Sequence, residues 1–269
     1  MSNIQVENNH MQQPPTSNAI GLWTLYLREV RRFMKVYTQT LLAPVVTTLL
    51  FLAVFTLALG QFRPDIHGVS FTTFLAPGLI MMAITQNAFA NTSSSIMIAK
   101  VQGNIVDTLM PPFSPHELVM GIAFGGVTRG VFVGISVALA MTAIVGLSLN
   151  NIWLIAYHAL MASLMLSLFG IIAGIWADKF DHMAAVTNFI VTPLAFLSGT
   201  FYSIDRLPET GQMLAHLNPF FYMIDGFRSG FIGHADIDTR VGIVVMALTN
   251  GVLWCVCTWM FRTGYKLKP

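Results

Sequence analysis

The sequence predicts an all-α polytopic membrane protein with six transmembrane helices, and three observations carry that prediction. Of the 269 residues, 55% are hydrophobic. Only 10% are charged, whereas a soluble domain carries about 25% charged residues. The apolar residues arrive in blocks of about twenty, the length that a helix needs to cross about 30 Å of hydrocarbon. Because lipid offers the backbone no hydrogen-bonding partners, each block is expected to be helical.

The composition and the motifs exclude several function classes. The net charge is only +2, so nothing resembles the basic surface of a nucleic-acid-binding protein. Cys255 and Cys257 lie two residues apart on an expected helix and point away from each other, which suits neither a disulfide nor a zinc site. The chain has no H-E-x-x-H pair and no G-x-x-x-x-G-K-[ST] or G-x-G-x-x-G motif. We therefore expect no catalytic residue, metal ligand or cofactor on this chain.

The N-terminal region divides into a tail and an amphipathic segment. Residues 1–19 are polar and lack the apolar core of a signal peptide, so we expect a flexible tail on the side of synthesis. In residues 20–37, a helical repeat of ~100° per residue aligns an apolar stripe formed by Trp23, Leu27, Val30, Met34 and Tyr37. The opposing flank consists of the cations Arg28, Arg31, Arg32 and Lys35. This pattern is typical of a helix in the headgroup layer with its cations toward anionic lipid; the alternative is a cytoplasmic extension of the first span.

Six uncharged or nearly uncharged runs follow, at about 39–60, 70–92, 118–145, 152–176, 183–203 and 241–261. Internal prolines at 44, 77 and 193 mark expected kinks or ends, because proline removes a helical hydrogen bond. Six crossings place both termini on one side of the membrane. That side carries nine of the Lys and Arg residues and the other side carries four. The excess of positive charge predicts that both termini are cytoplasmic.

The third run contains Arg129, the one formal charge near the middle of a span. An Arg at the bilayer centre costs ~2.5 to 3.5 kcal/mol on insertion scales, so it should face protein or water. It either lines a translocation path and binds an anionic group, or bonds carbonyls at a helix end. The glycines around it form three G-x-x-x-G spacings and are Gly121, Gly125, Gly126, Gly130 and Gly134. Such spacings permit close helix approach, either within one subunit or at a dimer seam.

The segment between the second and third runs, residues 98–121, is the largest internal loop on the terminus side. Its first half, Lys100 to Met110, is predicted to form a short amphipathic helix that Pro111, Pro112 and Pro115 stop. Its apolar side chains are Ile105, Val106, Leu109 and Met110, and they alternate with the polar Gln102, Asn104 and Asp107. The pattern favours a helix that docks on a partner or on the ends of its own spans.

After residue 20 the chain resembles the ABC-2 type permeases, the membrane subunits of bacterial ATP-binding cassette exporters. The resemblance lies in the order and spacing of FLAPGLIMM (74–82), PPFSPHELVMG (111–121), TRG (128–130), PLAFLSGTFYSIDRLP (193–208) and LNPFFYMIDGFRSGFIG (217–233). It implies that residues 20–269 form one transmembrane domain, which dimerises and binds two copies of a separately encoded ATPase. That ATPase would hold the ATP and the Mg ions.

The resemblance also assigns roles to segments. Residues 100–110 match the family's coupling helix, which fits a groove on the ATPase, and residues 20–37 match its interfacial helix. Residues 204–235 match an outward region, between spans 5 and 6, in which short helices re-enter the membrane. Val106 stands where the family usually has an acidic residue, and Asp107 lies beside it.

The expected function is that of an exporter's permease subunit in the cytoplasmic (inner) membrane. It would act by alternating access and use the energy of the ATPase. The scarcity of intramembrane charge favours an amphipathic or lipid-linked cargo such as a polysaccharide, a lipo-oligosaccharide or a hydrophobic drug. A stand-alone secondary transporter or channel is the alternative, and it would predict several intramembrane acids, which the spans lack. A membrane enzyme would need a convergent polar set that these runs do not supply.

Overall fold

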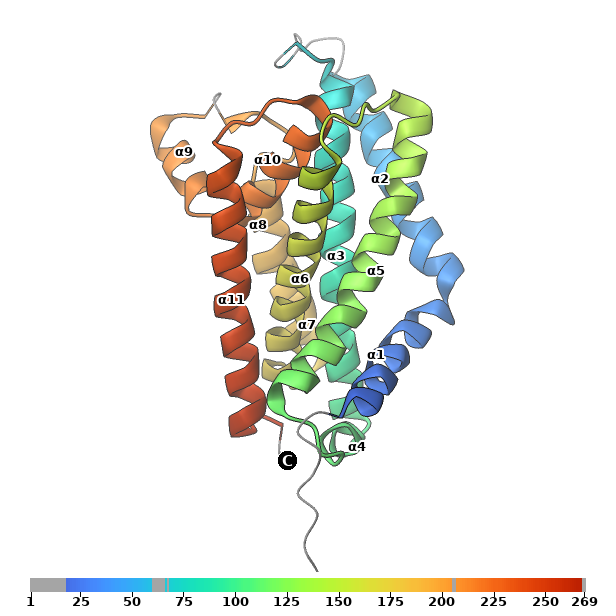
Figure 1. The fold of residues 1–269 in the computed structure, drawn as a ribbon. Helices are drawn as coiled ribbons and strands as arrows, with labels where there is room; N and C mark the ends of the chain where they lie inside the picture. The colour runs from blue at the N-terminus through green and yellow to red at the C-terminus, as the bar shows by residue number, and fades with distance from the viewer. Residues whose placement is uncertain (1–17, 60–65, 67, 205–206, 268–269) are drawn as a thin grey trace, which may run out of the picture.

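The computed structural model describes residues 18–59, 66, 68–204 and 207–267. The predicted tail, residues 1–19, lies outside these ranges except for its last two positions. Apart from one isolated bridge between Ile66 and Val69, the regular structure of the described chain is helical. Long helices run side by side as a bundle, with α1 and α4 at one end and α9 and α10 at the other (Figure 1). We call these the α4 end and the α10 end.

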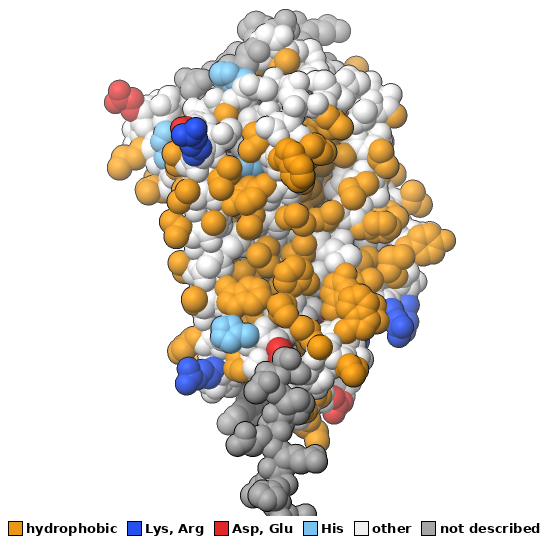
Figure 2. Space-filling model, in the orientation of Figure 1, with side chains coloured by type: hydrophobic (Ala, Val, Ile, Leu, Met, Phe, Trp, Pro, Cys, Tyr) orange, Lys and Arg blue, Asp and Glu red, His pale blue; other side chains and the backbone are white. Residues whose placement is uncertain are grey.

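Within the described ranges, five helices are long and apolar enough to cross a membrane: α2 (Tyr37–Leu59), α3 (Phe71–Val101), α5 (Pro115–Val145), α6 (Ile152–Trp176) and α11 (Thr239–Thr263). They match five of the six predicted runs, and they confirm an all-helical, multi-pass membrane protein. Hydrophobic side chains cover the middle of the visible face, whereas charged side chains lie toward the two ends (Figure 2). That distribution is the one a protein surrounded by hydrocarbon requires.

Helix α3 extends beyond its predicted end at residue 92 and continues to Val101. The serines near that predicted end do not break it, because Ser94 donates its hydroxyl to the carbonyl of Ala90 in the same helix. The chain turns only at Gly103, whose φ of +74° suits glycine. The α3 helix therefore reaches past the bundle and delivers the following segment to the α4 end.

The predicted fifth span, residues 183–203, is not one long helix. Instead α7 (Phe180–Val186), the π-helical turn η1 (Thr187–Val191) and α8 (Thr192–Phe196) follow one another, and the helical run ends seven residues early. Pro193 accounts for the irregularity, since it has no N–H to donate to a preceding carbonyl and the π turn lies directly before it. The sixth crossing therefore stays a prediction.

The centre of the bundle is α3, which lies against α5 and α6. Glycines of α5 permit this approach: a Cβ at Gly126 would lie 2.3 Å from Oγ of Ser167, and a Cβ at Gly130 would lie 3.0 Å from the carbonyl oxygen of Ile84. Both positions are buried. The structure thus places this glycine row against α3 and α6 of its own chain.

Helix α1 (Ala19–Met34) lies obliquely across the α4 end and packs on α5. A second glycine row of α5 receives it, because a Cβ at Gly121 would meet Leu25 and a Cβ at Gly125 would lie 2.4 Å from Cβ of Glu29. The helix ends three residues before the predicted 37, and the chain turns through Lys35 before α2 begins. Close backbone approach therefore anchors α1 to the bundle.

Part of the apolar stripe that the sequence predicts is exposed on α1, at Trp23 and Met34, whereas Leu27 and Val30 are half-buried. Trp23 is 59% exposed and Tyr37, at the start of α2, is 56% exposed. Trp23 also packs against the ring of Tyr26, 5.3 Å away between centroids. Large exposed aromatic side chains on one side of an amphipathic helix are typical of the membrane interface.

At the opposite end, two short helices follow the broken run: α9 (Glu209–His216) and α10 (Pro219–Ile232). Helix α10 packs against α3, α6 and α11, and its aromatic residues Phe220, Phe221, Phe227 and Phe231 are buried. It is thus part of the bundle and not a surface loop. Whether it enters the membrane from the outer side remains a prediction of the resemblance.

Candidate functional site between α1 and α4

The predicted coupling helix is shorter than the sequence indicates. Helix α4 comprises only Ile105–Leu109, because residues 102–104 form a turn and Lys100 belongs to the end of α3. Gln102 and Asn104 are exposed in that turn, where the Asn104 amide lies 3.5 Å from Oε1 of Gln102. Of the predicted coupling residues, α4 itself therefore contains Ile105, Val106, Asp107 and Leu109, and Met110 caps it.

Helix α4 has a docked side and a free side. Ile105 is 8% exposed and Leu109 is partly buried against the same hydrophobic cluster. Val106 is 48% exposed and Met110 is 76% exposed, with Asp107 exposed between them in the sequence. The helix therefore packs on the ends of its own spans, which is one of the two predicted alternatives, and presents two apolar side chains outward.

Lys100, the first residue of the predicted coupling segment, lies at the end of α3 and bonds to the end of α6. Its Nζ donates to the carbonyls of Ile175 and Ala177, at 2.7 and 2.6 Å, so it satisfies the backbone at the end of α6. Asp178 lies 3.6 Å from Lys100 and accepts a 3.0 Å hydrogen bond from Lys266. That hydrogen bond holds the pKa of the Asp178 carboxyl below its usual value. Lys100 thus ties α3 to the end of α6.

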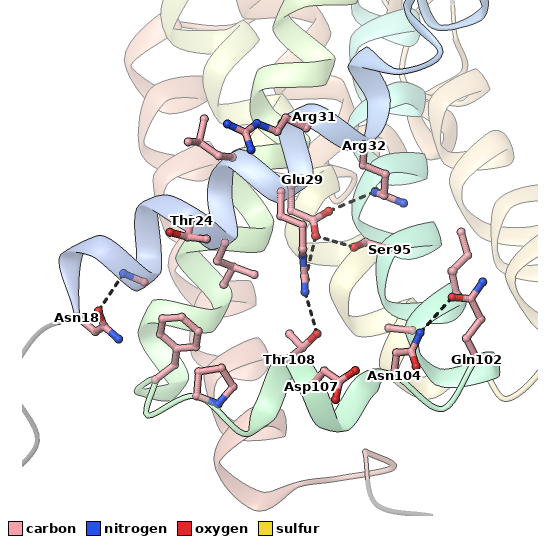
Figure 3. Close-up of a pocket in the computed structure, with 18 of the residues that line it drawn as sticks. Asn18, Thr24, Glu29, Arg31, Arg32, Ser95, Gln102, Asn104, Asp107 and Thr108 are labelled. Carbon is pink, nitrogen blue, oxygen red and sulfur yellow. Dashed lines mark hydrogen bonds and ion pairs between the residues drawn. The ribbon is translucent and has the colours of Figure 1, made fainter.

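A buried carboxylate on α1 organises the site. Glu29 is 1% exposed, and its Oε1 accepts a 2.9 Å hydrogen bond from the hydroxyl of Ser95 on α3. Its two oxygens also lie 3.2 Å from Arg28 and 3.3 Å from Arg32 (Figure 3). Sequence reasoning missed Glu29, since an acid among arginines suggests an exposed ion pair. Glu29 lies four residues from Leu25 and four from Phe33, which are both buried. This helical spacing was the sequence signal that Glu29 lies on the buried side of the helix.

The two arginines connect α1 to its neighbours. Arg28 donates a 3.1 Å hydrogen bond to the hydroxyl of Thr108 on α4. Arg32 donates to the Ser94 hydroxyl at 3.1 Å and to both the backbone and side-chain oxygens of Asn91, on α3. Burial lowers the pKa of the Arg32 guanidinium, and Glu29 opposes that shift. One ion-pair network therefore links α1, α3 and α4.

Arg129 extends this polar contact into the bundle. It is half-buried on α5, and its Nη2 donates a 3.2 Å hydrogen bond to Oδ1 of Asn87 on α3. Asn87 and Asn91 lie one turn apart on α3 and are followed by Ser94 and Ser95. This row accepts hydrogen bonds from Arg129 and Arg32 and donates one to Glu29. The sequence did not connect Arg129 with the α1 network because α3 provides the link.

A cavity of about 990 Å³ lies between α1, the end of α3 and α4 (Figure 3). The three arginines of α1, Arg28, Arg31 and Arg32, line it together with Lys35 directly after the helix and with the carboxylates Glu29 and Asp107. Its apolar lining includes Leu25, Leu27 and Ile98. Among the described residues, no cluster of three or more His, Cys, Asp or Glu side chains could hold a metal ion. The arrangement is suited to binding and to transmitting movement between helices.

Comparison with known proteins gives this arrangement a context. Residues 21–232 match the family model described as ABC-2 type transporter. The chain is similar to the inner membrane transport permease YadH of Escherichia coli (strain K12), with 37% identity over 251 residues that cover 93% of this chain and 97% of the relative. It is also similar to nodulation protein J of Rhizobium leguminosarum bv. viciae, with 25% identity over 209 residues, or 76% of this chain and 79% of that protein.

Proposed function

The chain belongs to the ABC-2 type transporter family, and from that premise we propose that it is the permease subunit of an exporter that a separate ATPase powers. In this proposal the α4 end faces the cytoplasm, both termini are cytoplasmic, and the protein resides in the inner membrane. Two copies of the chain assemble with two copies of the ATPase, which binds ATP and Mg. The chain itself is not an enzyme.

The observation that supports this proposal best is the free side of α4. Val106 and Met110 are exposed on α4, whereas Ile105 and Leu109 of the same helix pack against the bundle. Exposed apolar side chains on a short, docked helix are typical of a surface that another protein covers. Asp107 and the turn residues Gln102 and Asn104 are also exposed, so polar groups lie close in the sequence to this apolar pair, as at the rim of an interface.

The ion-pair network suggests how movement of α4 reaches the spans. When ATP binding closes the ATPase dimer, α4 is displaced, and the hydrogen bond between Thr108 and Arg28 carries that displacement to α1. Glu29 and Arg32 pass it to α3 through Ser95 and Asn91. The cavity between two permease copies then changes from inward-open to outward-open. Transport also requires that the cargo binds the two states with different affinity.

The distribution of charge favours an amphipathic or lipid-linked cargo, such as a polysaccharide, a lipo-oligosaccharide or a hydrophobic drug. Glu117, in the first turn of α5, is the one carboxylate within the five candidate spans. Its Oε2 accepts from the backbone of Ser114 in a capping box, so it serves the helix start. A stand-alone secondary transporter or channel would need ionisable groups deeper in the membrane, so we rank it second.

Co-purification with the ATPase tests the proposal. The change of Val106 or Met110 to Asp adds a charge on the free side of α4, where neither side chain supports the core. We expect each variant to insert normally and to lose the ATPase. Met213→Asp is the matched control, since Met213 is 67% exposed on α9 at the other end. Unchanged association of both α4 variants would remove the coupling role, and transport by nucleotide-free vesicles would favour the second-ranked function.

A further inference from the structure

The cations of α1 gather on the cavity between α1 and α4. Positions 28, 31, 32 and 35 recur at helical spacing, and all four side chains line this cavity. Among the described residues, two carboxylates line it with them, Glu29 and Asp107. The cavity therefore has more positive than negative charge.

The excess charge resides on two particular residues. Arg28 and Arg32 share the single carboxylate of Glu29, and both make further hydrogen bonds to the protein. Arg31 and Lys35, by contrast, have no ion pair and no side-chain hydrogen bond to any residue that the structure describes. Asp107, although it lines the cavity, pairs with neither. Two cations that line the cavity thus have no partner in the described chain.

The position and lining of the cavity identify the kind of anion. Helix α1 exposes Trp23 and Met34 on its surface, as an interfacial helix does, so the cavity lies at headgroup depth. Leu25, Leu27 and Ile98 add an apolar lining beside the cations. An inorganic anion needs no apolar lining, whereas a lipid combines a charged phosphate with an apolar body.

We propose that the cavity between α1 and α4 binds the phosphate group of an anionic membrane lipid, with Arg31 and Lys35 as its principal partners. The bound lipid bridges α1 and α4 and so adjusts the position of the helix that contacts the ATPase. This inference rests on the proposed function for the orientation of the α4 end and for the consequence of binding. Binding itself requires only the purified chain.

Native mass spectrometry of the full chain, purified without any ATPase, tests the proposal. We expect retention of phosphatidylglycerol in preference to phosphatidylcholine, because only the former has a net negative headgroup. The double variant Arg31→Gln/Lys35→Gln should bind phosphatidylglycerol at least about ten-fold more weakly, as expected when two Lys or Arg charges near a membrane surface are removed. Neither residue has a partner in the described chain, so the double variant should unfold at the wild-type temperature.

The matched control is Lys179→Gln/Arg262→Gln, which removes two exposed cations from the same end of the molecule. It should leave phosphatidylglycerol binding unchanged. An equal loss in this control, or equal retention of both lipids by the wild type, would overturn the proposal. If equimolar inorganic phosphate displaces the lipid, the site binds free phosphate, and the proposal of a lipid site is overturned.

Two further results separate this proposal from the proposed function. If the Arg31→Gln/Lys35→Gln variant keeps its lipid but loses the ATPase, the cations serve an acidic surface of the partner and the lipid site is refuted. If lipid binding fails in the variant while the α4 variants keep their ATPase, the lipid site stands and the coupling role of α4 falls.

Discussion

The two ends of the bundle use arginine in opposite ways. At the α4 end, the Arg28 side chain is 49% exposed and that of Arg32 is 31% exposed, and both share Glu29 beside an open cavity. At the α10 end, Arg228 is 3% exposed and lies 3.9 Å over the ring of Phe74 on α3. The first arrangement leaves room for a ligand and for movement. The second is closed.

The closed arrangement holds α10 in place. Arg228 donates to the carbonyls of Gly199 and Thr200, at 2.6 and 3.4 Å, in the turn after α8. Asp225 accepts from the backbone amides of Asp236 and Ile237, at 2.9 and 3.3 Å, just before α11. Each charged side chain of α10 thus satisfies backbone groups of a neighbouring segment. Charge therefore satisfies buried backbone groups at the α10 end, whereas at the α4 end it lines an open cavity and includes the unpaired cations Arg31 and Lys35.

The largest effect on stability should come from Arg228→Met. The substitution leaves the accepting carbonyls of Gly199 and Thr200 without their donor in a buried site. The free energy of unfolding should therefore fall by about 3 kcal/mol. Thermal unfolding in detergent measures this loss. Arg240→Met is the control, because Arg240 is exposed near the same end and should unfold as the wild type does. Equal melting temperatures of Arg228→Met and Arg240→Met would contradict the stabilising role of Arg228 on which the comparison of the two ends rests.

Gly125→Ala should have a smaller effect, confined to α1. The new Cβ would lie 2.4 Å from Cβ of Glu29, so α1 must move away, at a cost of about 1 to 3 kcal/mol. Faster trypsin cleavage at Arg31 should accompany the lower melting temperature. Gly251→Ala on α11 meets nothing within 4 Å and should stabilise slightly through helix propensity. A Gly125→Ala protein with wild-type proteolysis would show that α1 is not seated on α5.

Glu29→Gln should affect coupling more than stability. The amide can still accept from Ser95 but no longer balances Arg28 and Arg32, both partly exposed, so we expect a loss of about 1 kcal/mol. ATP-driven transport should fall at least about ten-fold while the ATPase stays bound. Ser95→Ala, which removes one hydrogen bond but keeps the charges, is the milder comparison. Full transport by Glu29→Gln would exclude the network as the route of movement.

The smallest effect on stability should come from Lys35→Gln. Lys35 is exposed and has no partner in the described chain, so the free energy of unfolding should change by less than about 0.5 kcal/mol. Differential scanning fluorimetry can compare it with Arg228→Met in one experiment. A large loss would mean that the α4 end, too, depends on its cations for folding.

The sequence predicts the long helices well because hydrocarbon demands continuous apolar runs. The predicted ends of α2, α6 and α11 all lie within two residues of the observed ends. It fails where local chemistry overrides hydropathy, as at Pro193, whose missing N–H accompanies the π turn and an early helix end. It also overextends α4 to Lys100, because the carbonyls of α6 that bind this lysine lie about 75 residues away.

The candidate site was predicted in part. The apolar pair Val106 and Met110 and the four cations of α1 follow from helical periodicity. Glu29 was not recognised, since its burial depends on Gly125 of α5 and on Ser95 of α3, which no local pattern connects to it. The buried roles of Asp225 and Arg228 were missed because α10 was interpreted as part of an outward loop.

The position and protection of α4 test the central claim most directly. The cysteine at position 110, in a Met110→Cys/Cys255→Ser protein whose remaining Cys257 is buried, should react with a membrane-impermeant maleimide in inside-out vesicles and not in right-side-out vesicles. Bound ATPase should protect it, whereas a Met213→Cys reference at the α10 end should show the reverse sidedness and no protection. Labelling of position 110 from the outer side, or equal labelling with and without bound ATPase, would contradict the account.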